Sequence, residues 1–273
     1  MTVAARTLAS IRATPTLLRV GLAEAIAYRA EFVVWMLTST MPLVMLGLWT
    51  SVAAEGEGAF AQFTADDFIA YYLVTLMVRN LTGNWVLWQI NDEIRRGLLS
   101  MRLLRPVHPF VTYAASHFAS VPLRCVVVLP FALILALSAA RAQLTGDPAL
   151  IALFAAAVLG SWILTFLTLV TLGCLCFFIE KSMALFEVYM GVFAIFSGYL
   201  IPLPLLPGWV RDAADWTPFR YMLAFPVETL LGWYDRGDVL GLLGRQWLFV
   251  GVMLAVALGL WRAGGRRFEA YGA

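Results

Sequence analysis

Long uncharged apolar segments alternate with short charged segments along almost the whole chain. An α-helix needs about 20 mainly apolar residues to cross the hydrocarbon core of a bilayer. The pattern therefore predicts an all-α integral membrane protein with six transmembrane helices. We place these spans at residues 32–54, 68–89, 113–140, 149–179, 183–200 and 243–261.

Two further segments predict helices that do not cross the membrane. In residues 1–30, apolar residues recur at helical spacing between arginines, which favours an N-terminal amphipathic helix along the membrane interface over a disordered basic tail. Residues 201–240 are too apolar for a free loop and too interrupted by prolines for a span. Irregular backbone at membrane depth must be buried in protein, so we expect outer re-entrant helices between spans five and six.

Composition supports a membrane protein and excludes other classes. Hydrophobic residues make up 62% of the chain and charged residues 13%, whereas roughly a quarter of the residues are charged in a soluble domain. The formal net charge of +2 is too small to indicate nucleic-acid binding.

The distribution of charge predicts the orientation. The loop at residues 55–67 is acidic and contains no basic residue, whereas arginine-rich segments follow the second and sixth spans. Arginine and lysine accumulate on the cytoplasmic side of membrane proteins. We therefore expect a multi-pass protein of the cell inner (cytoplasmic) membrane with both termini in the cytoplasm.

Residues 91–106 carry four arginines between two apolar segments. As a single helix, this segment would place Ile94, Leu98 and Met101 on one apolar face, and Pro106 would end the element. Such a short amphipathic helix outside the bilayer could dock a cytoplasmic partner. The alternative is a solvated, positively charged loop that only fixes the topology.

Charged and amide side chains inside the predicted spans are costly and are normally paired or face a watery cavity. One hypothesis is that they line or gate a transport path. The other is that Glu187 pairs with one of two arginines and locks helices together. The residues concerned are Arg79, Asn80, Asn84, Arg124 and Glu187.

Nothing in the sequence indicates an enzyme site. A phosphate-binding loop needs a glycine-rich run that ends in Lys followed by Ser or Thr. The sole lysine, Lys181, precedes Ser182, but no glycine loop precedes it. The histidines and cysteines also lack the spacing of a metal site, so we expect no catalytic residue and no metal in this chain.

Three motifs carry a resemblance to a known family. They are Glu93-Ile-Arg-Arg-Gly97 with Leu103-Leu-Arg-Pro106, Ser197-Gly-Tyr-Leu-Ile-Pro202 with Leu206-Pro-Gly-Trp209, and the terminus Arg266-Arg-Phe-Glu-Ala-Tyr-Gly-Ala273. In this order, and with six spans, the chain resembles the permease subunits of ABC-2 type ATP-binding-cassette exporters. The likeness is to a small six-span subgroup encoded beside a second permease and an ATPase. It covers essentially the whole chain, as a single transmembrane domain over residues 1–273.

The resemblance implies that residues 91–106 are a coupling helix seated on a cytoplasmic ATPase subunit. The turn at Glu180 and Lys181 would make a second, smaller contact. The residues to which the resemblance assigns coupling are Asp92, Glu93, Arg95, Arg96, Gly97, Leu98, Met101, Arg102, Arg105, Glu180 and Lys181.

The resemblance also implies a function. The chain would pair with a second permease, identical or a sister chain, and export an amphipathic or lipophilic compound, drug-like or lipid-like, among membrane lipids. ATP and Mg²⁺ would be bound by the partner ATPase and no cofactor by this chain. The alternative is a secondary transporter driven by an ion gradient, but that class favours polar residues at the midplane and two related halves. This sequence offers only Glu187, off-centre, and no internal repeat.

Overall fold

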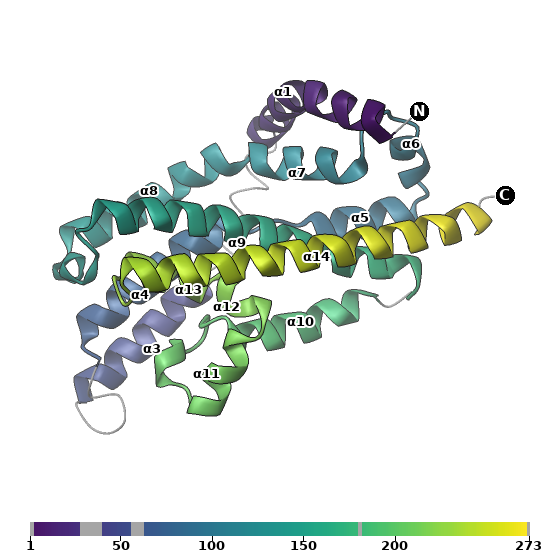
Figure 1. Ribbon diagram of the computed structural model, residues 1–273. Coiled ribbons are helices and arrows are strands. Elements are labelled where there is room, and N and C mark those ends of the chain that lie inside the picture. The colour runs from purple at the N-terminus through teal and green to yellow at the C-terminus, as the bar shows by residue number, and fades with distance from the viewer. Residues whose placement is uncertain (1–2, 28–39, 56–62, 180–181, 272–273) are drawn as a thin grey trace.

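The computed structural model describes residues 3–27, 40–55, 63–179 and 182–271, and every regular element in these ranges is helical (Figure 1). The α-helices are α1 (Val3–Ala27), α3 (Met41–Glu55), α4 (Ala65–Thr82), α5 (Val86–Arg95), α6 (Leu99–Leu103), α7 (Pro109–Ala119), α8 (Val121–Leu137), α9 (Pro148–Cys174), α10 (Ser182–Phe196), α11 (Gly208–Asp215), α12 (Pro218–Met222), α13 (Ala224–Leu230) and α14 (Arg236–Tyr271). Short 3₁₀ helices are η1 (Ala139–Gln143), η2 (Leu175–Phe177) and η3 (Leu203–Leu205).

Helix α9 lies at the centre of the bundle and contacts α4, α5, α10, α12, α13 and α14. Nearly every α9 side chain in the range 160–170 is buried. Gln246 of α14 is fully buried, and its Nε2 donates to the carbonyl oxygens of Ala157 at 3.0 Å and Tyr221 at 2.9 Å. Because an apolar interior has no water to bind these groups, this one amide fixes α14 against both α9 and α12.

Three helical stretches in the described residues are long and apolar enough to cross a membrane. They are Pro109–Leu137, Pro148–Phe177 and Arg236–Phe268. They overlap the third, fourth and sixth predicted spans, although α14 extends well beyond the predicted range of 243–261 at both ends. The third predicted span, 113–140, is displaced: it begins at Pro109, bends at Ser120 between α7 and α8, and ends at Leu137.

The second predicted span, 68–89, was wrong as a continuous helix. Helix α4 ends at Thr82, and α5 begins at Val86 after three residues without helical structure. The Gly83 amide donates to the Arg79 carbonyl at 3.0 Å and closes the last turn of α4. The polar stretch that the sequence placed inside a span is therefore the end of one helix and the start of another.

The fifth predicted span, 183–200, was also too long, because α10 ends at Phe196. The chain turns at Gly198, which has a φ of +75°. Two tyrosines of α4 hold this turn: the Tyr71 hydroxyl donates to the Gly198 carbonyl at 2.7 Å, and the Tyr72 hydroxyl donates to the Leu200 carbonyl at 2.7 Å. Trp49 of α3 also donates to the Leu200 carbonyl, at 3.0 Å. The turn is thus stabilised by side chains distant in sequence.

The predicted coupling helix at 91–106 is divided into two helices. Helix α5 ends at Arg95, and Gly97 follows with a φ of +71°. This left-handed conformation, which glycine adopts at low cost, ends an α-helix. The short helix α6 then begins at Leu99 in a new direction.

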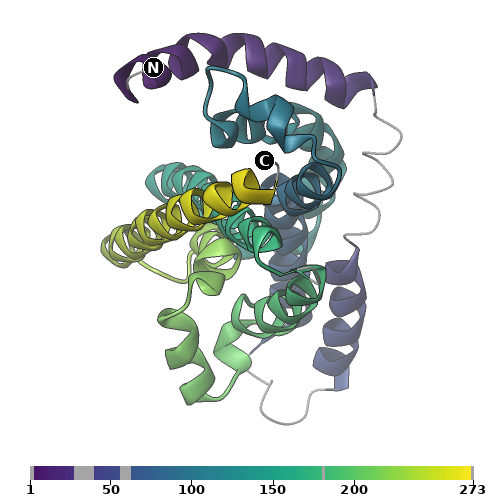
Figure 2. The ribbon, with the colours of Figure 1, turned by 90° about the vertical axis from the view of Figure 1, so that its right-hand side faces the viewer.

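The N-terminal helix α1 lies across α7 on one side of the bundle (Figures 1 and 2). Gly21 allows the close approach, since a Cβ atom there would lie 3.0 Å from the Ala119 Cβ. The position of α1 at a membrane interface stays a prediction. Of the first predicted span, 32–54, the structure describes α3, and residues 28–39 lie outside the described ranges.

The predicted re-entrant segment 201–240 folds into η3, α11, α12 and α13, and its last residues belong instead to α14. Residues 221–229 are all buried. They pack against α4 and α9. A connection with this much backbone inside the bundle therefore contributes to the core.

Replacement of Gly198 by Ala tests the α10 turn. A Cβ atom would meet the Tyr71 hydroxyl, and the left-handed φ adds strain, so we expect a loss of about 1 kcal/mol or more of stability. The apparent Tm of the detergent-solubilised protein should fall by roughly 3 °C or more. Gly191 of α10 is the matched control, because a Cβ there would meet nothing within 4 Å. Equal Tm values for G198A and G191A would contradict this account.

Candidate functional site

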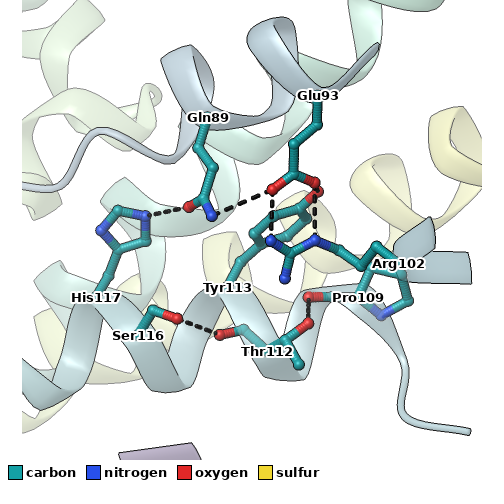
Figure 3. Close-up of polar contacts among 8 residues, drawn as sticks. All are labelled: Gln89, Glu93, Arg102, Pro109, Thr112, Tyr113, Ser116 and His117. Atoms are coloured by element: carbon teal, nitrogen blue, oxygen red, sulfur yellow. Dashed lines mark hydrogen bonds and ion pairs between the residues drawn. The ribbon is translucent and has the colours of Figure 1, made fainter. Parts of the chain in front are cut away.

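The carboxylate of Glu93 joins three helices (Figure 3). Glu93 lies on α5 and is 8% exposed. The guanidinium of Arg102, on α6, donates from Nε to Oε2 of Glu93 at 2.7 Å and also pairs through Nη2 with Oε1. The hydroxyl of Tyr113, on α7, donates to Oε2 at 2.5 Å. A two-point arginine–carboxylate pair is among the strongest side-chain contacts, so Glu93 fixes α6 to α5 and α7.

The contacts of Glu93 continue along α5 and α7. The amide nitrogen of Gln89 donates to Glu93 Oε1 at 3.3 Å. The amide oxygen of Gln89 lies 3.2 Å from Nε2 of His117 and accepts its hydrogen. The Arg102 guanidinium also lies over the Tyr113 ring, 4.4 Å from its centroid. The α5–α7 contact is therefore polar over about one helical turn, and a shift of α6 would disturb all of it.

The opposite face of α6 is exposed and apolar. Leu98, Met101 and Leu104 are 50%, 67% and 81% exposed, whereas Leu99 between them is 1% exposed and packs inward. We call these three exposed residues the α6 surface. Exposed arginines at positions 95, 96 and 105 flank it in the sequence. An apolar centre with a charged rim is typical of a protein interface.

The structure separates the predicted coupling residues into two groups. Glu93 and Arg102 are largely buried and hold α6 in place, while Leu98, Met101 and Arg105 are exposed. Two contacts lie at the end of α5: Arg96, the residue that follows the helix, pairs with Asp92 at 2.7 Å, and Arg95 Nε donates to Asn91 Oδ1 at 2.9 Å. Gly97 provides the turn between the groups. Glu180 and Lys181 lie outside the described residues. The start of α10 and the C-terminal end of α14 lie at the same end of the bundle as α6 (Figure 1).

Arg124 of α8 completes the break between α4 and α5. Its Nη1 donates to the Asn80 carbonyl at 2.9 Å, and its Nε donates to the Ser120 hydroxyl at 3.1 Å. The guanidinium also lies 5.1 Å from the centre of the Trp85 ring. A cation at the C-terminal end of a helix binds carbonyls that have no helical partner, and it interacts favourably with the negative end of the helix dipole. Arg124 therefore stabilises the broken helix.

The other polar residues predicted inside the membrane do not form one cluster. The side-chain amides of Asn80 and Asn84 donate to α4 carbonyls, at 2.8 Å to Leu76 and at 3.5 Å to Thr82. Arg79 points toward α10, with its guanidinium 5.0 Å from the centre of the Phe193 ring and 5.9 Å from that of Tyr199.

Glu187 also lies on α10, where it is exposed. The ion pairs between described residues include none that joins Glu187 to Arg79 or Arg124. The hypothesis that Glu187 locks these helices together by pairing with an arginine therefore stays a prediction. The contacts described above are those of Arg79 with aromatic rings and of Arg124 with a carbonyl, a hydroxyl and the Trp85 ring.

Sequence reasoning missed a buried charge cluster in the segment 201–240. Arg220 of α12 pairs with Asp215 of α11 and, at 3.1 Å, with Glu228 of α13. Its Nη2 donates to the Tyr234 hydroxyl at 2.6 Å, and that hydroxyl donates to Glu228 at 3.2 Å. Burial, and then the Glu228 carboxylate, raise the pKa of Tyr234 to about 12, so the hydroxyl keeps its proton at neutral pH. The signal was present, since an arginine and a glutamate eight residues apart interrupt an apolar stretch.

No group of three or more His, Cys, Asp or Glu side chains in the described part of the chain is arranged to hold a metal ion. In a comparison with protein families, the family described as ABC-2 family transporter protein matches residues 36–272. A search of curated proteins gives no match. The matched range includes α5, α6, Arg124 and the buried cluster around Arg220.

Replacement of Arg102 by Met tests whether the Glu93 contact holds α6. The variant keeps a long side chain but removes the charge that pairs with Glu93. We expect the backbone amides of residues 99–103 to exchange hydrogen about tenfold faster, equivalent to about 1.4 kcal/mol of local stability. Arg105→Met is the matched control, because Arg105 is exposed on the same segment. If both variants exchange at the wild-type rate, Glu93 does not hold α6 in place.

Proposed function

The chain belongs to the ABC-2 transporter family of membrane-embedded proteins, and on that basis we propose that it is the permease subunit of an ATP-driven exporter. The ATP-hydrolysing subunit is a separate cytoplasmic chain, which binds ATP and Mg²⁺. The permease pairs with a second six-span subunit, identical or a sister chain, in the cell inner membrane. Both termini and α6 lie on the cytoplasmic side, because the arginines concentrate there.

The observation that carries this proposal is the α6 surface. Apolar side chains as exposed as Met101 and Leu104 are unfavourable in water, by about 25 cal/mol for each Å² of apolar area. The arginines around them are unfavourable in lipid. A soluble protein that covers the apolar centre and pairs with the arginine rim satisfies both requirements. The ATPase subunit is such a partner.

The contacts of Glu93 support a mechanism for coupling. When ATP closes the ATPase subunits, α6 moves with them. Because Arg102 and Tyr113 share the Glu93 carboxylate, α5 and α7 move with α6. The non-helical residues 83–85 separate α5 from α4 and absorb the change in direction. Arg124 holds the end of α4 in place during this movement through its hydrogen bond to the Asn80 carbonyl.

The substrate side of the proposal rests on Arg79. Its guanidinium faces the aromatic rings of Phe193 and Tyr199, between α4 and α10. A charge beside aromatic rings suits an amphipathic or lipophilic compound with a polar group. We therefore propose that Arg79 lies on the path of a drug-like or lipid-like substrate, and that movement of α4 against α10 releases it outward.

Reversal of the arginine rim tests the docking proposal. In the variant Arg95→Glu/Arg96→Glu, a complementary acidic surface on the ATPase would be repelled. We expect the ATP hydrolysis that copurifies with the chain from its native membrane to fall about tenfold or more, as for the loss of charged contacts at an interface. Binding of the chain to the membrane should not change.

The control reverses two exposed arginines away from α6, in the variant Arg141→Glu/Arg211→Glu. This variant should retain the wild-type ATP hydrolysis. Undiminished hydrolysis in Arg95→Glu/Arg96→Glu would exclude the rim as a docking site.

A further inference from the structure

A pocket of about 420 Å³ lies far from the α6 surface and opens on the surface of the protein. It is lined by Phe63, Asp67, Pro204, Trp233 and Tyr234. These residues belong to the start of α4 and the residues just before it, to η3 and to the segment before α14. The starts of α4 and α14 lie at the left of Figure 1, whereas α6 lies at the right. Its volume falls in the range of small-ligand sites, about 300–1,000 Å³.

The aromatic walls of the pocket are held in position. The rings of Phe63 and Trp233 are 5.9 Å apart, centre to centre, and inclined at 72°, so they form two sides of a corner. Trp233 also stacks on the buried Tyr71 at 5.8 Å, nearly parallel at 14°. The Tyr234 hydroxyl is fixed by Arg220 and Glu228. Aromatic faces that are already ordered lose little entropy when a ligand binds.

The charge around the pocket is negative. Both cap contacts of Asp67, from the amide and the hydroxyl of Thr64 at 2.7 Å each, use Oδ2. Among the described residues, Oδ1 accepts no hydrogen bond, and it remains available to a ligand. Behind Tyr234, the single charge of Arg220 faces two carboxylates, Asp215 and Glu228. An anion would be repelled here and a cation attracted.

We propose that this pocket binds an organic cation of the trimethylammonium type. Such a cation has no N–H group, so it needs no ring of hydrogen-bond acceptors, and it binds over aromatic faces with a carboxylate nearby. Phe63, Trp233 and Tyr234 line the pocket with aromatic rings, and Asp67 supplies the carboxylate. The Arg220 guanidinium lies 5.9 Å from the centre of the Tyr234 ring, so a ligand would approach Tyr234 on the side away from Arg220. The cation is either the headgroup of a choline lipid or a free molecule. The site depends on these residues alone and not on coupling to an ATPase.

Equilibrium dialysis with radiolabelled choline tests the proposal on the full chain in phosphatidylglycerol nanodiscs, which contain no ammonium headgroup. We expect saturable binding at one site, and competition at least about tenfold weaker from the neutral isostere 3,3-dimethylbutan-1-ol. Trp233→Ala should weaken choline binding by about tenfold. The matched control, Trp216→Ala, removes a tryptophan that is 85% exposed and outside the pocket, and it should bind as the wild type.

Two conservative variants distinguish loss of the binding site from loss of folding. Trp233→Phe keeps a ring against Tyr71 and should bind choline with intermediate affinity. Asp67→Asn removes the charge while its amide oxygen can still accept from Thr64, and it should weaken binding several-fold. Equal binding of choline and the neutral isostere, or wild-type binding by both Trp233 variants, would overturn the proposal.

The same measurement distinguishes the two sources of the cation. In nanodiscs that contain phosphatidylcholine, a lipid headgroup in the pocket would compete with choline and lower its apparent affinity. Unchanged affinity there, together with dependence on Trp233, would assign the site to a free cation.

Discussion

Backbone groups at the ends of broken helices are the constraint on which this structure depends. In an apolar interior, the last carbonyls of a helix have no water to bind, and an unsatisfied group costs several kcal/mol, which is a large part of the stability of a whole domain. Arg124 donates a hydrogen bond to a carbonyl at the end of α4, and the hydroxyls of Tyr71 and Tyr72 donate to carbonyls in the turn after α10. These contacts allow a chain of long apolar segments to contain turns within its bundle, and the turns position the charged and aromatic side chains.

Side-chain contacts on its inner side likewise explain why α6 can present an apolar surface. A helix of five residues is too short to be stable alone. Arg102 and the buried Leu99 anchor its inner side, and the Glu93 carboxylate gives that anchor a defined geometry. The outer side is then free to carry Leu98, Met101 and Leu104. Coupling needs both properties, since a surface that binds a partner transmits movement only when it is rigidly attached to the helices behind it.

The sequence predicted the helical membrane class and the approximate location of three long apolar helices, because their apolar stretches are long, although the ends of the third and sixth spans differ from the prediction. It did not predict the breaks at 83–85 and after Phe196, because the side chains that stabilise them come from distant segments. The division of residues 91–106 at Gly97 could have been predicted from the sequence, since glycine is a common residue at the end of a helix. In the candidate site, the exposure of Leu98 and Met101 agrees with docking, whereas the structural function of Glu93 and Arg102 depends on how α5, α6 and α7 fold together. The pairing of Arg220 with Glu228 likewise requires the short helices α12 and α13.

The central claim is that the α6 surface contacts a cytoplasmic ATPase, and site-specific crosslinking tests it most directly. A photoreactive amino acid would replace Leu104 in the chain in its native membrane, with the same replacement of Trp216 as the control. After illumination, mass spectrometry identifies each covalent adduct. The account predicts an adduct between position 104 and a soluble ATP-binding protein, and none of that protein at position 216. Adducts of position 104 with lipid alone would contradict it.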